Sequence, residues 1–458
     1  MSDSTIAAIS TPPGRSALAV VRVSGPDTAG VADRLGLPET HLRVARYATL
    51  RHPATDEPVD DVVAVRFAGP ASYTGEDMLE ISCHGGSLVP QLVLSAVCEA
   101  GARPAEPGEF TRRAFLNGKL DLMQAEATLD LIDARSPAMH RAALFQLERG
   151  LSGRIEELRE ELLNLQGLVA YDIDFPEEDD GPVPAANIDA AANRLHVALG
   201  RMLELAPEGE LLRDGALTVI AGRPNVGKSS VFNALLGCER AIVTEEPGTT
   251  RDAIEALVSV SGYPFRLVDT AGLREGAGRV EGMGIEVARS YLERADVVLL
   301  CVEAGRSPGP DEVEFLAEVG SSEPCRAIVL RTKFDLGADS AGAQTAHEKL
   351  SESVAELPVS AHTGEGLPQL RDALLQRAYS GIRSEEETPV VTRARHVECL
   401  RRAREDVSAF QDARVAGLPA EIAVTHVQDA TLALEDLLGA VTSEDVLDRV
   451  FSSFCVGK

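Results

Sequence analysis

A glycine-rich segment, GRPNVGKSS, follows an apolar run and constrains the fold of this chain more than any other feature. The run ALTVIAG (216–222) predicts a buried strand, and SVFNALLG after the segment predicts a helix. The segment fits G-x-x-x-x-G-K-S from Gly222 to Ser229, where glycines let backbone N–H groups wrap phosphates. Lys228 would reach the β- and γ-phosphates, and Ser229 would hold Mg²⁺. A strand, this loop and a helix in that order predict a P-loop domain with a parallel sheet.

Three short motifs follow in the order expected of a GTP site. DTAG (269–272) ends the next apolar strand, where a carboxylate can hold Mg²⁺ through water. TKFD (332–335) follows AIVLR, and SAHTG (360–364) follows ELPV. The carboxylate of Asp335 can accept hydrogen bonds from the N1–H and 2-amino group of guanine, so the expected nucleotide is GTP. Thr332 replaces the usual Asn of N-K-x-D, and we expect this to weaken purine binding without changing specificity.

The residues that would activate water are less clear from these motifs. Leu273 stands where Ras-like enzymes have the Gln that orients the attacking water, and no arginine finger is evident in the sequence. Either the domain is a slow switch, or another cation and another polar group replace them. Glu275 and Glu281 are the candidates for orienting water.

The distribution of apolar residues predicts a multidomain protein of the α/β and α+β classes. Short β-rich runs with one helical stretch after Gly86 predict an N-terminal α+β domain over 1–118. Helical periodicity over 119–213 and again over 382–458 predicts one discontinuous helical domain. The G domain, Ras-like in its motifs, would occupy 214–381 as an insertion.

Charge and cysteine usage limit the remaining classes. The formal net charge of −28 argues against broad electrostatic binding of nucleic acid. No stretch approaches the ~20 apolar residues of a membrane span. Seven cysteines without a C-x-x-C motif suit a reducing compartment, so we expect a cytoplasmic protein that has no membrane partner.

The chain resembles the tRNA-modification GTPase family, MnmE/TrmE, over essentially its full length. The resemblance rests on TPPGRSALAVVRVSG, YTGEDMLEISCHGG, PGEFTRRAFLNGKLDLMQAEA, GRPNVGKSS, VTEEPGTTRD, DTAGLRE and the terminal FCVGK. It implies an N-terminal folate-binding domain and a helical domain interrupted by a G domain.

The resemblance also implies the cations of the G domain. K⁺ would take the place of the arginine finger, held by Asn225, Thr244, the carbonyl of Glu246 and Thr249. Thr250 would join Ser229 on Mg²⁺, and Glu281 would orient water. The G domains of a homodimer would meet across their nucleotides. The residues expected to contact GTP are Asn225, Val226, Gly227, Lys228, Ser229, Ser230, Thr244, Glu245, Glu246, Pro247, Gly248, Thr249, Thr250, Asp269, Thr270, Ala271, Gly272, Thr332, Lys333, Asp335, Ser360, Ala361 and His362.

The family's site for 5-formyl- or 5,10-methylene-tetrahydrofolate matches Arg22, Glu80, Lys119 and Lys458. On spacing alone, Arg22 and Glu80 are predicted to be polar strand residues, and the folate role comes from the resemblance. Cys455 in FCVGK has the position of a prenylated cysteine, but Gly457 and Lys458 do not fit that motif. The resemblance instead implies that Cys455 lies near the folate site, as a catalytic thiol or a packed one.

The function implied is a K⁺-dependent GTP hydrolase acting on the wobble uridine of certain tRNAs. With a flavoprotein partner (MnmG/GidA), which would carry FAD, it would add an aminomethyl-type group, such as carboxymethylaminomethyl, to C5. The complex would be a heterotetramer or larger, and the folate would supply one carbon. A ribosome-assembly GTPase and a GTP-gated scaffold without tRNA chemistry remain the alternatives.

Overall fold

The computed structural model describes residues 4–38, 41–174, 184–238, 254–269, 290–310, 312–313, 327–336, 355–384, 389–441 and 443–457. The chain divides into two compact units. The first consists of Met1–Leu129, Gln146–Arg159 and Thr431–Lys458; the second consists of Asp130–Phe145 and Glu160–Ala430. The division into three domains at the boundaries given above stays a prediction. Within the described ranges, no helix combines the length and apolarity needed to cross a membrane.

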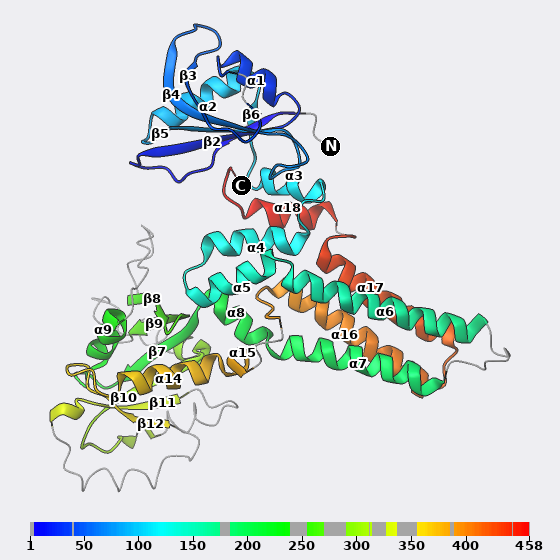
Figure 1. Ribbon diagram of the computed structural model, residues 1–458. Helices are drawn as coiled ribbons and strands as arrows, with labels where there is room; N and C mark the ends of the chain where they lie inside the picture. The colour runs from blue at the N-terminus through cyan, green and yellow to red at the C-terminus, as the bar shows by residue number, and fades with distance from the viewer. Residues whose placement is uncertain are drawn as a thin grey trace. The chain divides into compact units, whose positions relative to one another are not determined.

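The first unit contains a six-stranded sheet in the order β3-β4-β5-β2-β1-β6 (Figure 1). Its strands are β1 (Ile6–Ile9), β2 (Leu18–Ser24), β3 (Arg46–Arg51), β4 (Pro58–Phe67), β5 (Met78–His84) and β6 (Arg103–Pro104). Neighbouring strands are antiparallel except β1 and β6, which are parallel. Helices α1 (Thr28–Arg34) and α2 (Val89–Glu99) pack against the sheet, which confirms the expected α+β class. The sequence reading found α2 but not the shorter α1.

Alternation along β2 and β5 decides which side chains are available for a site. Val21, Val23 and Ile81 are fully buried in the core that includes residues of α1 and α2. Successive side chains of a strand point to opposite faces. Arg22 of β2 and Glu80 of β5 are directly paired in register and therefore lie together on the other face. The same alternation that builds the core thus brings an Arg and a Glu side by side.

The end of the chain belongs to the first unit. Helix α18 (Glu444–Ser452) packs with α3 (Glu109–Leu116) and the start of α4 (Leu122–Asp133), through a core that includes Leu122 and Phe451. Gly108 has φ 69°, and a Cβ there would lie 2.5 Å from the carbonyl oxygen of Phe451. Only glycine fits this close approach.

The second unit contains the α/β part, a sheet in the order β12-β11-β10-β7-β9-β8. Its strands are β7 (Ala216–Gly222), β8 (Ile254–Val260), β9 (Tyr263–Asp269), β10 (Val297–Glu303), β11 (Ala327–Thr332) and β12 (Ala355–Pro358). All pairs are parallel except β8 and β9, which confirms the predicted α/β class. The antiparallel β8 was not predicted from the sequence.

Both faces of this sheet are buried, which explains why its strands are continuous apolar runs. One face packs in a core with residues of α9 (Lys228–Cys238) and α14 (Leu367–Ala378). The other face forms a second core that includes Val219, Val268 and Leu300. The sheet is therefore a rigid support for the loops at its strand ends.

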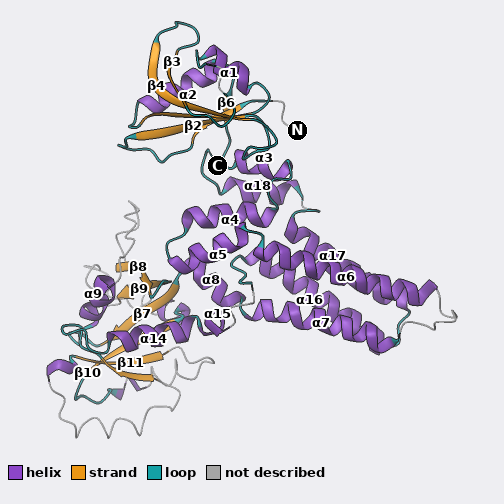
Figure 2. Ribbon diagram, in the orientation of Figure 1, coloured by secondary structure: helices purple, strands orange, loops and turns teal. Residues whose placement is uncertain are grey.

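Most of the remaining described elements are helices (Figure 2). They are α5 (Pro137–Leu147), α6 (Gly150–Asp174), α7 (Ala185–Glu204), α8 (Ala206–Asp214), α15 (Ser380–Ser384), α16 (Ala394–Val415) and α17 (Ala420–Leu438). Just before α16, Arg393 forms a two-point ion pair with Asp130, with N–O distances of 3.1 and 2.6 Å. The sequence reading predicted α7 but not the separate α8 after it.

Tyr379 joins three elements of the second unit. Its side chain is fully buried, and its hydroxyl lies 2.9 Å from the carbonyl oxygen of Leu211 and 2.7 Å from that of Pro264. Its ring meets Phe265 edge to face at 5.5 Å. Burial raises the pKa of Tyr379, so the phenol is neutral and acts as a donor. Tyr379 therefore ties the end of α14 to α8 and β9.

We predict that Tyr379→Phe destabilises the second unit by about 1–2 kcal/mol, because the buried carbonyl group of Pro264 and the part-buried one of Leu211 lose the hydroxyl that they share. Hydrogen exchange of peptides from β7 and β9 should become faster. Tyr263→Phe is the matched control, since the ring of Tyr263 stacks on Tyr379 at 4.9 Å and its side chain is only partly buried. Equal exchange rates in the two variants would contradict the role given to the Tyr379 hydroxyl.

Candidate functional site

The loop between β7 and α9 has the backbone of a phosphate-binding loop. Gly222, Asn225 and Gly227 have φ values of 139°, 63° and 102°. A Cβ at Gly222 would lie 2.5 Å from the carbonyl oxygen of Cys301, so this position requires glycine. Left-handed residues within such a loop turn successive N–H groups toward one concave surface that suits an anion. The sequence prediction for this segment is therefore matched by its backbone.

Lys228 and Ser229 begin α9 directly behind this loop. The ammonium of Lys228, 6% exposed as a residue, donates to the carbonyl oxygens of Gly222 at 3.0 Å and Arg223 at 2.7 Å. The hydroxyl of Ser229 donates to Oδ2 of Asp269 at 2.8 Å. Asp269 ends β9, the strand next to β7, which explains why residues 40 positions apart meet. A hydroxyl beside a buried carboxylate is a set of hard oxygen donors that suits Mg²⁺.

Thr332, at the end of β11, has a role that the sequence reading missed. It is buried, and its hydroxyl donates to the carbonyl oxygen of Val226 in the loop. It also lies 3.3 Å from the carbonyl oxygen of Val302. The side chain thus ties the loop to two strands of the sheet. Its position in T-K-x-D was the available signal, but that motif indicated only a contact with the base.

The other predicted base-side residues lie on neighbouring loops. Lys333 has φ 58°, and its Nζ donates to Oε1 of Glu303 at 3.0 Å. Asp335 is exposed in the 3₁₀ turn Phe334–Leu336. Ser360 is fully buried and accepts the N–H of Thr363 at 3.1 Å, whereas His362 is exposed and Ala361 is partly buried. Two further predicted GTP contacts come from the β7–α9 loop and the start of α9: Val226 is buried and Ser230 is exposed.

Several predicted residues lie outside the described part of the chain. They are Thr244, Glu245, Glu246, Pro247, Gly248, Thr249, Thr250, Thr270, Ala271, Gly272, Glu281 and Lys458, together with the alternative water-orienting residue Glu275. Among the expected K⁺ ligands, the structure therefore describes Asn225, which is exposed. The roles of all these residues stay predictions.

In the first unit, Arg22 and Glu80 form an ion pair. Nε and Nη2 of Arg22 lie 3.0 and 2.8 Å from Oε1 of Glu80. The guanidinium also stands 5.6 Å from the ring centre of Tyr73. Lys119 donates to the carbonyl oxygen of Pro70 at 2.9 Å. Tyr73 and Pro70 belong to the loop between β4 and β5, so this loop contacts both Arg22 and Lys119.

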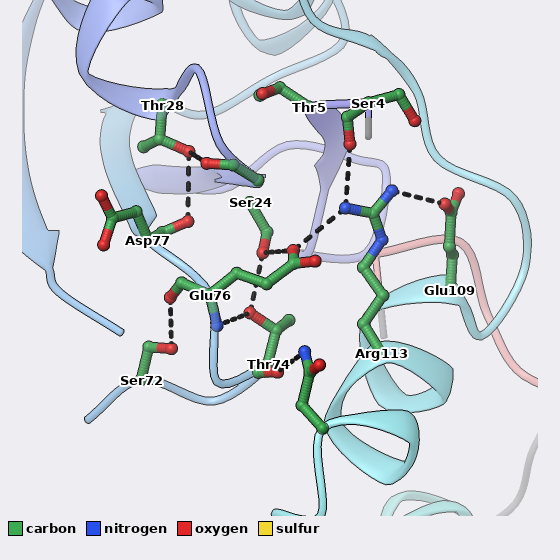
Figure 3. A network of polar contacts seen from close by, with 12 residues as sticks. Ser4, Thr5, Ser24, Thr28, Ser72, Thr74, Glu76, Asp77, Glu109 and Arg113 are labelled. Atoms are coloured by element: carbon green, nitrogen blue, oxygen red, sulfur yellow. Dashed lines mark hydrogen bonds and ion pairs between the residues drawn. The ribbon is translucent and has the colours of Figure 1, made fainter. Parts of the chain in front are cut away.

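A network of hydrogen bonds and ion pairs around Glu76 and Arg113 connects the β4–β5 loop to β2 and α3 (Figure 3). The carboxylate of Glu76 accepts hydrogen bonds from Ser24 at 2.8 Å and from Arg113 at 3.0 Å. Arg113, whose side chain is 6% exposed, also donates to Glu109 at 2.9 Å. Burial opposes the charge of Glu109, but the contacts with Arg103 and Arg113 outweigh it and lower the pKa of Glu109. Arg113 lies within PGEFTRRAFLNGK, but nothing in that segment predicts its contact with Glu76, 37 residues away.

The C-terminal tail lies against the N-terminal sheet and the start of α3. Val456 forms an antiparallel bridge with Pro107, and the carbonyl of Gly457 accepts the hydroxyl hydrogen of Ser10 at 3.2 Å. Cys455 is exposed and is a free thiol. The tail is therefore fixed on the first unit by its backbone, and the chemical role of Cys455 stays a prediction.

Comparison with known proteins gives the same assignment along the whole chain. Residues 5–119 match the family described as GTP-binding protein TrmE N-terminus, and residues 122–455 match the MnmE helical domain. A protein of Salinibacter ruber named tRNA modification GTPase MnmE is 41% identical over 99% of both chains. One of the same name from Geobacter metallireducens is 40% identical over 100% of this chain and 99% of its own. With the phosphate-binding loop, the Ser229–Asp269 pair and these full-length matches, the chain belongs to the MnmE family of tRNA modification GTPases.

Proposed function

We propose that this protein hydrolyses GTP as part of tRNA modification and that its GTP site binds both Mg²⁺ and K⁺. The observation that carries the proposal is the contact of Ser229 with the buried carboxylate of Asp269, beside the ammonium of Lys228. A P-loop NTPase uses these three groups to hold Mg²⁺ and the terminal phosphates. Full-length relatives named tRNA modification GTPase support the assignment of the role.

Lys228, Ser229 and Asp269 would each have a distinct task with GTP. The ammonium of Lys228 would exchange the carbonyl oxygens of Gly222 and Arg223 for phosphate oxygens, which are stronger acceptors because they are charged. The hydroxyl of Ser229 and the carboxylate of Asp269 would hold Mg²⁺, directly and through water. Backbone N–H groups of the loop would surround the phosphates.

The side-chain amide of Asn225 supports the proposal of a K⁺ site. The left-handed backbone of Asn225 lies in the turn of the loop, and an amide oxygen is a suitable ligand for a hard monovalent ion. K⁺ bound there would supply the positive charge that an arginine finger supplies elsewhere. The other ligands, Thr244, Glu246 and Thr249, and the water-orienting Glu281 belong to the same proposal, as does Thr250 on Mg²⁺.

The first unit suits a folate. The planar edge of a pterin carries an N–H and a 2-amino group, and the carboxylate of Glu80, held by Arg22, could accept hydrogen bonds from both. Lys119, which donates to the carbonyl oxygen of Pro70, would meet a carboxylate of the cofactor. The reaction proposed is addition of an aminomethyl-type group to C5 of a wobble uridine. A flavoprotein of the MnmG/GidA type would be the partner of a homodimer of this chain in the cytoplasm.

GTP turnover in matched KCl and NaCl tests the cation proposal. We expect strong stimulation by K⁺ that disappears in Asn225→Gly, because glycine keeps the φ of 63° without strain and removes only the amide. Asn233→Ala, an exposed position of α9, should retain the stimulation. Equal, slow turnover of the unmodified protein in both salts would contradict the K⁺ site and favour a GTP-gated scaffold.

The tether made by Thr332 gives a second prediction. Thr332→Val should weaken GDP binding roughly fivefold to tenfold, since the loop loses a buried hydrogen bond worth about 1 kcal/mol. Thr332→Ser keeps the hydroxyl and should bind GDP as the unmodified protein does. A fluorescent GDP analogue reports the dissociation constants. If valine and serine bind equally well, the hydroxyl contact with Val226 does not stabilise the site.

The folate proposal has an equally direct test. Glu80→Gln should weaken binding of 5-formyltetrahydrofolate at least about tenfold, since a charge-assisted pair is lost. The exposed Glu57→Gln on the turn before β4 is the control and should leave binding unchanged. Isothermal titration calorimetry of the full chain measures both. Failure of the unmodified protein to bind would contradict the folate site itself, separately from the GTPase.

A further inference from the structure

Three side chains with metal-ligand chemistry meet between α16 and α17, away from the sites above. Asp406 comes from α16, and His426 and Asp429 come from α17. A potential ligand atom of each lies within 4.8 Å of those of the other two. His426 and Asp429 are three residues apart in sequence, a spacing that places both on one face of a helix. The four-residue connection from 416 to 419 holds the two helices as a hairpin.

Other charged side chains of α16 form ion pairs that do not involve Asp406, His426 or Asp429. On α16, Arg401 forms ion pairs with Glu398 and Glu405, and Arg414 pairs with Asp189 at 2.8 Å. Across the described ranges, Asp406, His426 and Asp429 have neither a hydrogen bond nor an ion pair. Glu398 and Glu405 of α16 are thus taken up by Arg401, whereas the ligand atoms of Asp406, His426 and Asp429 face one another.

The surroundings of Asp406 disfavour the charged form of its carboxylate. Burial and the negative charge of Asp429 raise the pKa of Asp406, and Glu405 adds to the effect. His426 and Arg402 act in the opposite direction but do not overcome it. A bound cation would remove the repulsion between the two carboxylates.

We propose that Asp406, His426 and Asp429 bind one divalent transition-metal ion of the Zn²⁺ type. The imidazole of His426 decides which class of metal ion fits the site. Nitrogen ligands favour Zn²⁺ and similar transition-metal ions, whereas Mg²⁺ and Ca²⁺ prefer oxygen ligands alone. Three protein ligands leave room for water in the remaining position. At ligand distances of about 2.1 Å, the ion would draw the three groups closer by side-chain rotation and link α16 to α17.

The test uses the full-length protein, freed of metal with a chelator and held in excess Mg²⁺ and GDP so that hard-cation sites are filled. Zn²⁺ is titrated by calorimetry into the unmodified chain and into His426→Ala, Asp429→Asn and the control Glu421→Gln, which changes an exposed carboxylate of the same helix. Co²⁺ provides an independent reading, because its weak visible d–d absorption in water intensifies when protein ligands lower its coordination number.

We expect Glu421→Gln to bind Zn²⁺ as the unmodified chain does. His426→Ala and Asp429→Asn should lose one equivalent, or bind it more than about tenfold more weakly. The Co²⁺ band should disappear with His426. Equal stoichiometry and affinity in all four proteins would overturn the proposal and assign any binding to other groups, such as the free thiols. Asp429 is exposed, so its variant decides the question if His426→Ala fails to fold.

Discussion

The close approach of the β7 end to β10 is the constraint on which the nucleotide site depends. The backbone of Cys301 leaves no room for a side chain at Gly222, so the chain turns out of the sheet there and enters the loop. Lys228 and Ser229 then follow at the start of α9, next to the end of β9. Because both faces of the sheet are buried, these positions are fixed by packing before any ligand arrives.

In the first unit, ion pairs rather than a close backbone contact position the residues of the candidate folate site. Arg113 is almost fully buried and is held by Glu76 and Glu109, which offset the cost of removing its charge from water. Glu76 belongs to the loop that also carries Tyr73 and Pro70, the contacts of Arg22 and Lys119. A buried ion network thus positions the loop that contacts Arg22 and Lys119, two of the residues proposed to bind folate.

The sequence predicts those elements that a short run of consecutive residues determines. β7 was placed at its observed limits, because an apolar run ends at a glycine motif with a specific backbone requirement. The helices α1 and α8 were missed, since seven and nine residues give little periodicity. The pairs Arg113–Glu76 and Thr332–Val226 join residues 37 and 106 positions apart, and no local pattern contains such a contact. Family resemblance indicates which residues are expected to contact ligands, but not which residues, such as Arg113, position the loops that carry them.

Within the second unit, the contacts around α8 determine how the sheet and the flanking helices can move. The hydroxyl of Tyr379 bridges β9 and α8, and the carboxylate of Glu208 accepts the N–H groups of Gly381 and Ile382 at 2.8 and 2.7 Å. These bonds are partly or fully buried, so breaking them without replacement costs about 1–3 kcal/mol each. A shift of β9, which carries Asp269, therefore either moves Tyr379 and α8 with it or breaks the contact of the Tyr379 hydroxyl with Pro264. The segments on both sides of the α/β part are for that reason mechanically coupled to the strand that would sense Mg²⁺ and phosphate.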